Sequence, residues 1–182
     1  MKQYPYLYSV IVSILCTACT LQDTTQLRQH TNNEVPQAHL KVVKVDKSKI
    51  VIEQTIYVPV YSHIYYENQK QAIDLSATLS VRNTDLTTPI IITSVRYYDT
   101  NGRLVRKYLE RPIELGSLAS KDFVVERTDK SGGSGANFIV EWVAEKEVFQ
   151  PVVETVMISA SNAQGISFIS TGRIIKSRSL KK

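Results

Sequence analysis

The sequence predicts an all-β domain built as a sandwich of two antiparallel sheets. Apolar and polar residues alternate over short segments, turn residues separate these segments, and no window of eleven or more residues carries a helical stripe. Roughly eight or nine short strands of this kind pack most simply as two sheets face to face, and an immunoglobulin-like arrangement is expected. A small closed β-barrel is the alternative that the same pattern allows.

The clearest alternation lies in AIDLSATLSVRN, residues 72–83. The apolar residues occupy every second position, at Ile73, Leu75, Ala77, Leu79 and Val81. The polar residues between them project to the opposite side of an extended chain. This period of two predicts a strand with one face in the core and the other face in water.

Turn residues divide the rest of the domain into further strands. Asp99-Thr100-Asn101-Gly102 is a hairpin signal, because Gly102 accepts a positive φ, and it joins predicted strands at 90–98 and 103–110. Four later segments, KDFVVER, NFIVEWVAEK, VVETVMISAS and ISFISTGRII, have the β-branched and aromatic content of strands. Asn162-Ala163-Gln164-Gly165 is expected to join the last two of them.

The chain begins with the pattern of a secretory signal. Lys2 precedes an apolar run from about Leu7 to Leu15, and small residues follow this run. The run is shorter than the roughly 20 residues that a transmembrane helix needs. Residues 1–18 are therefore predicted to be a signal peptide.

The end of this segment, Leu15-Cys16-Thr17-Ala18-Cys19, is similar to the lipid-attachment box of bacterial lipoproteins. The resemblance implies cleavage after Ala18 and lipidation of Cys19, and Thr20 after the cysteine implies the outer membrane, if the cell has one. Cys16 departs from the pattern, which has an aliphatic residue there. A plain signal peptide with a free thiol at Cys19 is the alternative. No cysteine follows Cys19, which excludes a disulfide framework and a cysteine-based metal site or nucleophile from the mature domain.

Composition divides the rest of the chain. Residues 19–39 hold Cys19 and a polar segment almost free of aliphatic residues, which predicts a flexible tether. The β-sandwich domain is expected to occupy residues 40–175, and the basic tail residues 176–182.

The positive charge of the chain is concentrated at its C-terminal end. The net charge of +5 equals the charge of Arg173, Lys176, Arg178, Lys181 and Lys182 together. Such a tail is expected to be solvated, with contact to anionic lipid or cell-wall polymer as the alternative. No basic patch with regularly interleaved aromatic residues occurs, so no nucleic-acid partner is expected.

The segment TIYVPVYSHIYY, residues 55–66, is rich in tyrosine. Its period of two places an apolar set on a core face and the remaining residues on the other face, namely Tyr57, Pro59, Tyr61, His63 and Tyr65. Pro59 has no N–H to donate, so this strand is expected to lie at a sheet edge or to bend there. Cross-strand aromatic packing explains this second face. The alternative is a binding face, for which Tyr57, Tyr61, His63 and Tyr65 are the candidate residues.

Two other places supply candidate binding residues. The loop KSGGSGANF contributes Gly133 and Asn137, and the hairpin contributes Tyr97, Tyr98 and Asp99. A strand rather than a helix follows the loop, and its glycine spacing matches no phosphate-binding motif. A close approach of two backbone segments is therefore the expected role of its glycines.

No catalytic residue, metal site or cofactor is predicted. The motifs G-x-S-x-G and H-E-x-x-H are absent, and the glutamates of the later strands are expected on solvated faces. The protein is therefore expected not to be an enzyme. An envelope enzyme or metal-binding protein that uses His63 with nearby carboxylates is the alternative.

Several blocks of the sequence, in this order, resemble a bacterial family catalogued as domain of unknown function 3124: YVPVYSHIY, LSVRNTD, ITSVRYYDTNGRLVRKYL, SGGSGANFIVEW and GISFISTGR. The resemblance runs from about Tyr57 to Arg173 and implies no activity, cofactor or catalytic residue. Members of that family commonly follow secretion or lipoprotein signals, which agrees with Cys19. We therefore expect a lipid-anchored protein of the bacterial cell envelope that faces the periplasm. Its non-catalytic domain is expected to bind or scaffold another envelope component, a protein or a polymer.

Overall fold

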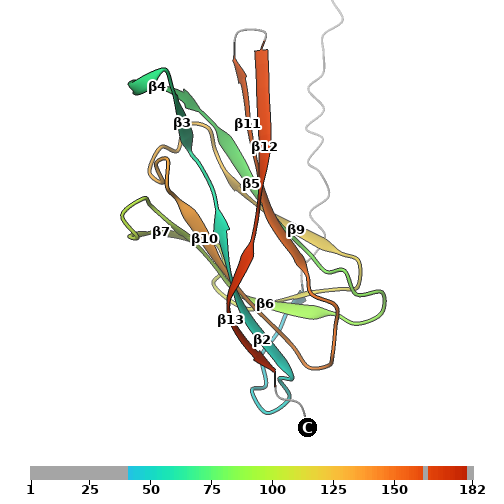
Figure 1. Ribbon diagram of the computed structural model, residues 1–182. Helices are drawn as coiled ribbons and strands as arrows, with labels where there is room; N and C mark the ends of the chain where they lie inside the picture. Colours follow the sequence, from blue (N-terminus) through green and yellow to red (C-terminus); the bar gives the residue numbers. More distant parts are fainter. Residues whose placement is uncertain (1–40, 162–163, 180–182) are drawn as a thin grey trace, which may run out of the picture. The chain divides into compact units, whose positions relative to one another are not determined.

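The computed structural model describes residues 41–161 and 164–179. The predicted signal peptide, the lipidation site Cys19 and the tether lie outside the described residues. Within the described part, every regular element is a strand and every strand pairing is antiparallel (Figure 1). The predicted all-β fold is confirmed.

The strands form two large sheets and one small ribbon. The seven-stranded sheet runs in the order β1 (Lys41–Val42), β8 (Ile113–Leu115), β6 (Ile90–Tyr98), β10 (Asn137–Ala144), β2 (Ile52–Pro59) and β13 (Arg173–Ser179), with β7 (Leu104–Lys107) also paired to β6. The four-stranded sheet runs in the order β12 (Gln164–Thr171), β11 (Val152–Ser161), β5 (Ser76–Arg82) and β9 (Ser120–Val125). The ribbon pairs β3 (His63–Tyr66) with β4 (Asn68–Asp74). None of the described sheets closes on itself, so the architecture is a sandwich and not a closed barrel.

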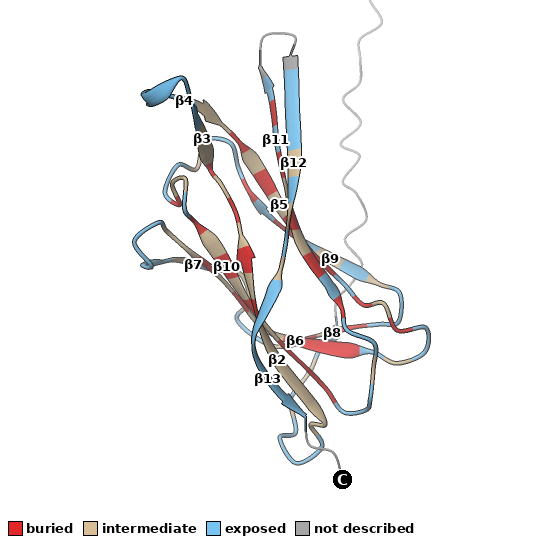
Figure 2. Ribbon diagram, in the orientation of Figure 1, coloured by how far each residue is buried: buried red, intermediate tan, exposed pale blue. Residues whose placement is uncertain are grey.

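The two large sheets enclose one hydrophobic core, to which strands of both contribute (Figure 2). Leu75, Leu79 and Val81 are fully buried, whereas Arg82 is exposed. The alternation predicted for residues 72–83 is therefore confirmed. Ser80 is an exception on the polar side, because it is buried and its hydroxyl accepts a hydrogen bond from Arg82 Nε at 3.1 Å.

The tyrosine-rich segment does not form one strand. β2 ends at Pro59, and β3 begins at His63 in the separate ribbon with β4. β2 lies between β10 and β13, so the expected edge position is wrong. Pro59 instead ends the strand, beyond Tyr57, the last residue of β2 that pairs with β13. Its missing N–H therefore costs the sheet no hydrogen bond on that side.

The last predicted strand, ISFISTGRII, is divided between the two sheets. Gly172 separates β12 from β13, and its N–H donates to the carbonyl of Val153 in the smaller sheet at 2.8 Å. The next residue, Arg173, pairs with Tyr57 in the larger sheet, so the chain crosses the sandwich at this glycine (Figure 1). β13 continues to Ser179, which places residues 176–179 of the predicted basic tail inside a strand.

A buried polar turn connects β5 to β6. Asn83 Nδ2 donates to three backbone carbonyl groups at 2.8–3.2 Å. The carboxylate of Asp85 accepts hydrogen bonds from the backbone N–H groups of Thr87, Thr88 and Phe149. These bonds, those from Thr87 and Thr88 above all, lower the pKa of Asp85 below its usual value. The sequence block LSVRNTD thus includes two polar residues that the fold itself requires.

Candidate functional site

A row of side chains crosses the outer face of the larger sheet. The strand registers place Arg173, Tyr57, Ile139, Arg96 and Lys107 opposite one another on β13, β2, β10, β6 and β7. Residues that oppose one another in antiparallel strands project from the same face. The residues on either side of Tyr57 in β2 are buried in the core, so this row faces solvent.

Tyr57 and Arg173 line a hollow of about 550 Å³ on this face. The other residues that line it are Pro59, Ser170, Thr171, Gly172 and Ile175. The hollow lies where the chain crosses between the sheets at Gly172. It offers one phenol ring, one guanidinium and two hydroxyl groups to a bound molecule.

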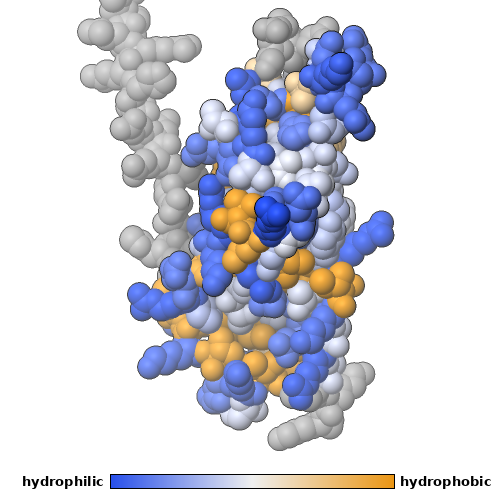
Figure 3. All heavy atoms as spheres, turned by 90° about the vertical axis from the view of Figure 1, so that its left-hand side faces the viewer, coloured by the Kyte–Doolittle hydropathy of each residue, from blue (hydrophilic) through white to orange (hydrophobic). Residues whose placement is uncertain are grey.

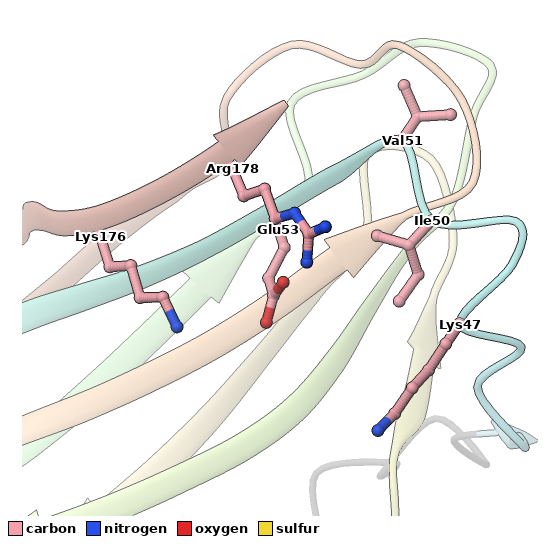
Figure 4. A pocket seen from close by; sticks show the side chains of 6 residues that line it. All are labelled: Lys47, Ile50, Val51, Glu53, Lys176 and Arg178. Carbon is pink, nitrogen blue, oxygen red and sulfur yellow. The ribbon is translucent and has the colours of Figure 1, made fainter. Parts of the chain in front are cut away.

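A second hollow, of about 340 Å³, lies further along β2 and β13. Lys176 and Arg178 reach it from β13, Glu53 from β2, and Lys47 from the loop that precedes β2 (Figure 4). Ile50 and Val51 form its apolar part. Since Arg178 lies opposite Glu53, this hollow is a continuation of the same outer face.

The two hollows together carry an excess of positive charge. Lys47, Arg173, Lys176 and Arg178 contribute four cations, and Glu53 contributes one carboxylate. None of these four cations forms an ion pair with a carboxylate in the described ranges 41–161 and 164–179. We call this region, with Tyr57, the β2–β13 surface. Unpaired cations beside an aromatic ring suit an anionic ligand.

Asn137 is the second predicted residue on this face. It lies opposite Pro59 on one side and opposite Tyr98 on the other, so all three project outwards with Tyr57. The neighbouring candidate, Tyr97, projects the other way and is fully buried, with its ring 5.1 Å from that of Phe138. Burial, with smaller contributions from nearby charges, raises the pKa of Tyr97 to about 12. Tyr97 is therefore part of the core, and Tyr98 is the tyrosine of this hairpin that solvent reaches.

The remaining tyrosines of residues 55–66 lie elsewhere. The ring of Tyr61 packs edge-on against Phe168 of β12, with 5.8 Å between the centroids. Tyr65 lies on the β3–β4 ribbon, where its ring is 5.2 Å from the ring of His63. The fold therefore separates these residues from Tyr57, and the predicted single face of tyrosines becomes three separate environments.

His63 lies opposite Asp74 in the β3–β4 ribbon. The carboxylate of Asp74 forms an ion pair with Lys130 at 2.8 Å. No group of three or more His, Cys, Asp or Glu side chains suited to a metal ion occurs in the part of the chain that the structure describes. The described contacts of His63 therefore give no support to a metal or acid–base site at this position.

The glycine loop and the hairpin turn hold each other. The carbonyl of Gly132 accepts hydrogen bonds from the N–H and the hydroxyl of Thr100, at 2.8 and 3.0 Å. A β-carbon at Gly132 would collide with the hydroxyl of Tyr97, and Gly133 has a φ of +78°. In the turn itself, Asp99 Oδ1 accepts from two backbone N–H groups. The structure thus gives Gly133 and Asp99 local roles in shaping the loops.

The sequence pattern does not identify the basic residues of β13 as part of the β2–β13 surface. Arg173, Lys176 and Arg178 do not follow a period of two, because a bulge between Ile174 and Lys176 shifts the register. The sequence predicts a strand only up to residue 175 and a solvated basic tail from residue 176, whereas β13 continues to Ser179. A signal does exist, since the β-branched residues Ile174 and Ile175 continue the strand composition up to Lys176.

Exposed hydrophobic side chains on the face seen in Figure 3 form several separate patches between hydrophilic ones. The described residues also contain no helix long and apolar enough to span a membrane.

No curated protein and no solved structure gives a significant match to the chain. One family model does match, over residues 53–175, and its description is "Protein of unknown function (DUF3124)". The match covers most of the sandwich, and the chain belongs to this family.

Proposed function

We propose that this protein is a non-catalytic binding module of the bacterial cell envelope, and that the β2–β13 surface holds an anionic envelope component. The observation that carries the proposal is the clustering of Lys47, Arg173, Lys176 and Arg178 around two hollows, without ion pairs to the described carboxylates. Such a cluster attracts anions and orients them through charge-assisted hydrogen bonds.

A comparison with the other cations on the same face supports placing the anion at the β2–β13 surface. Arg96, further along the row, lies 2.8 Å from Glu141 and is neutralised by it. The side of β13 carries three cations without an ion pair to a described carboxylate, whereas the other end of the row carries one, Lys107. Tyr57 adds a rigid ring with a polar tip beside the guanidinium of Arg173, a combination that suits carboxylate or phosphate groups joined to an apolar or sugar framework.

Support for binding rather than catalysis comes from the environment of His63. Its opposite residue, Asp74, is engaged by Lys130, and neither hollow includes His63. An acid–base or metal role would need a carboxylate or a second ligand directed at the imidazole.

The proposed location of the protein rests on its N-terminal sequence. A lipid on Cys19 would hold the domain at the membrane surface, and residues 20–39 would space it from the bilayer. Mass spectrometry of the native N-terminus tests this part alone: a diacylated or triacylated cysteine supports the anchor, and an unmodified residue contradicts it.

Binding is tested by sedimentation of the purified chain with bacterial envelope fragments. Reversal of three charges on β13, Arg173→Glu with Lys176→Glu and Arg178→Glu, is expected to weaken binding about tenfold or more, and salt is expected to weaken wild-type binding. The control carries the same charge change on exposed residues outside the surface, Lys70→Glu with Arg111→Glu and Lys146→Glu. Equal binding of both variants would contradict the proposal.

A further inference from the structure

β12 is an edge strand of the smaller sheet. It pairs with β11 on one side, and no described strand pairs with its other side. An edge of this kind presents a row of free backbone donors and acceptors, and proteins usually protect it with charges, proline, a bulge or short length.

The other described edges carry such protection. β13 has three basic residues and a bulge, and β9 contains Lys121 and Asp122. β7 has four residues, which include Arg106 and Lys107, and β1 has two residues. In the ribbon, β4 carries charged residues and β3 has an irregular register.

β12 has none of these devices. Its eight residues, QGISFIST, contain no charge and no proline, and its pairing with β11 has no register shift. Ile169 is 61% exposed. It lies in one cross-strand row with Val156 of β11, Thr78 of β5 and Val124 of β9. Figure 2 shows much of β12 as exposed. The strand is therefore regular, neutral and partly apolar, as a pairing strand needs to be.

The backbone groups that point away from β11 can be identified. The N–H of Gly172 donates to the carbonyl of Val153, the residue opposite it in the register. Because the ladder is regular, the hydrogen-bonded positions of β12 recur at every second residue from Gly172. Ser170, Phe168 and Ile166 therefore direct their N–H and C=O groups toward β11, as Gly172 does. The residues at the other positions, Gly165, Ser167, Ile169 and Thr171, direct theirs to the free edge.

We propose that β12 pairs with β12 of a second copy of this chain, antiparallel, and joins the two smaller sheets into one continuous sheet. Two-fold symmetry about Phe168 places Ser167 opposite Ile169 and Gly165 opposite Thr171, so each free N–H meets a free C=O of the other copy. No like charges oppose each other, because β12 has none. A second copy is the occupant that we infer, since the row of free donors and acceptors on β12 is complementary to itself under a two-fold axis and carries no charge that would repel its copy.

The test is sedimentation equilibrium of the full chain in density-matched detergent, from about 1 μM to 1 mM protein. The wild type is expected to shift from monomer to dimer over this range. The edge variant, Ser167→Lys with Ile169→Lys, places lysines opposite one another and is expected to weaken association about tenfold or more. The matched control, Thr78→Lys with Ile158→Lys, puts the same charges on the same outer face but on inner strands and is expected to dimerise like the wild type.

A third variant, Ser167→Pro, removes one outward N–H while leaving the β11 ladder in place. It is expected to reduce association with little change in the melting temperature, which separates lost pairing from lost folding. A wild type that remains monomeric up to 1 mM overturns the proposal. Equal association of the edge and control variants, or equal loss by both, overturns it as well.

Discussion

Gly172 lies against Ile56 at the point where the chain crosses from the smaller sheet to the larger one. A β-carbon on Gly172 would lie 2.6 Å from Ile56 Cγ2 and 2.8 Å from the carbonyl oxygen of Val153. Both distances are well below van der Waals contact. The absence of a side chain therefore allows the crossing, and the crossing brings Arg173 to its position opposite Tyr57.

Gly172→Ala is expected to lower the free energy of unfolding by about 1–3 kcal/mol, because the added methyl group overpacks a site bounded partly by backbone. Urea denaturation measures the loss. Gly116→Ala is the matched control, since a β-carbon there would meet no atom within 4 Å. If the two variants were equally stable, the close packing at the crossing would be disproved.

Tyr57→Ala and Tyr61→Ala are expected to separate binding from packing. Tyr61 packs against Phe168 and the edge of the core, so its truncation is expected to cost about 2 kcal/mol, roughly half the cost for a fully buried aromatic residue. Tyr57 lies on the outer face, and its truncation is expected to cost less than about 1 kcal/mol while weakening capture of envelope fragments. Thermal unfolding and sedimentation, applied to both variants, give the comparison. The opposite order of effects would place the binding face elsewhere.

Stability is expected to fall at alkaline pH because of Tyr97. Burial, followed by the charge of Asp129, raises its pKa from 10.0 to about 12 in the folded protein. The folded state therefore holds this proton more tightly than the unfolded state, so the stabilisation is complete below pH 10 and is lost as the pH rises toward 12. Urea midpoints between these pH values measure the decline.

Tyr97→Phe is expected to make that decline shallower. It does not abolish the decline, because burial also raises the pKa of Tyr108. An unchanged pH dependence in the variant would show that another group is responsible.

Protonation of Asp85 is expected to lower the stability of the protein at acidic pH. Hydrogen bonds from the N–H groups of Thr87 and Thr88 lower its folded pKa below the usual 3.8, so its stabilisation is present above about pH 4 and is lost as the pH falls through the folded value. Asp85→Asn is expected to be less stable than the wild type at pH 7, with a difference that narrows on acidification. Asp122→Asn, at an exposed position, is the control. A difference that stayed constant with pH would exclude this role.

The strands were largely predictable because each one carries its own period. The segment from Ile73 to Val81 alternates by composition alone, and the hairpin at Asp99–Gly102 is set by local turn chemistry. The same rule assigns Tyr97 to the face of the buried Val95 and Tyr98 to the face of Arg96, so alternation alone separates the buried tyrosine from the outward one.

The surface was less predictable, because alternation identifies a face and not the strand that lies beside it. Residues 164–179 have continuous strand composition, and only the packing of Gly172 against Ile56 and Val153 shows where they change sheets. Lys47 and Arg178 are distant in sequence and meet only through the pairing of β2 with β13. Such a site follows from strand register, which depends on the whole fold.

The central claim is that the β2–β13 surface contacts the ligand in the cell. A photo-crosslinking amino acid placed at Tyr57 in intact bacteria tests it, with the same group at Thr78, on the outer face of the smaller sheet, for comparison. The proposal predicts an adduct with an anionic envelope component from position 57 and little or none from position 78. No adduct at position 57, or equal capture of the same component at both positions, would contradict it.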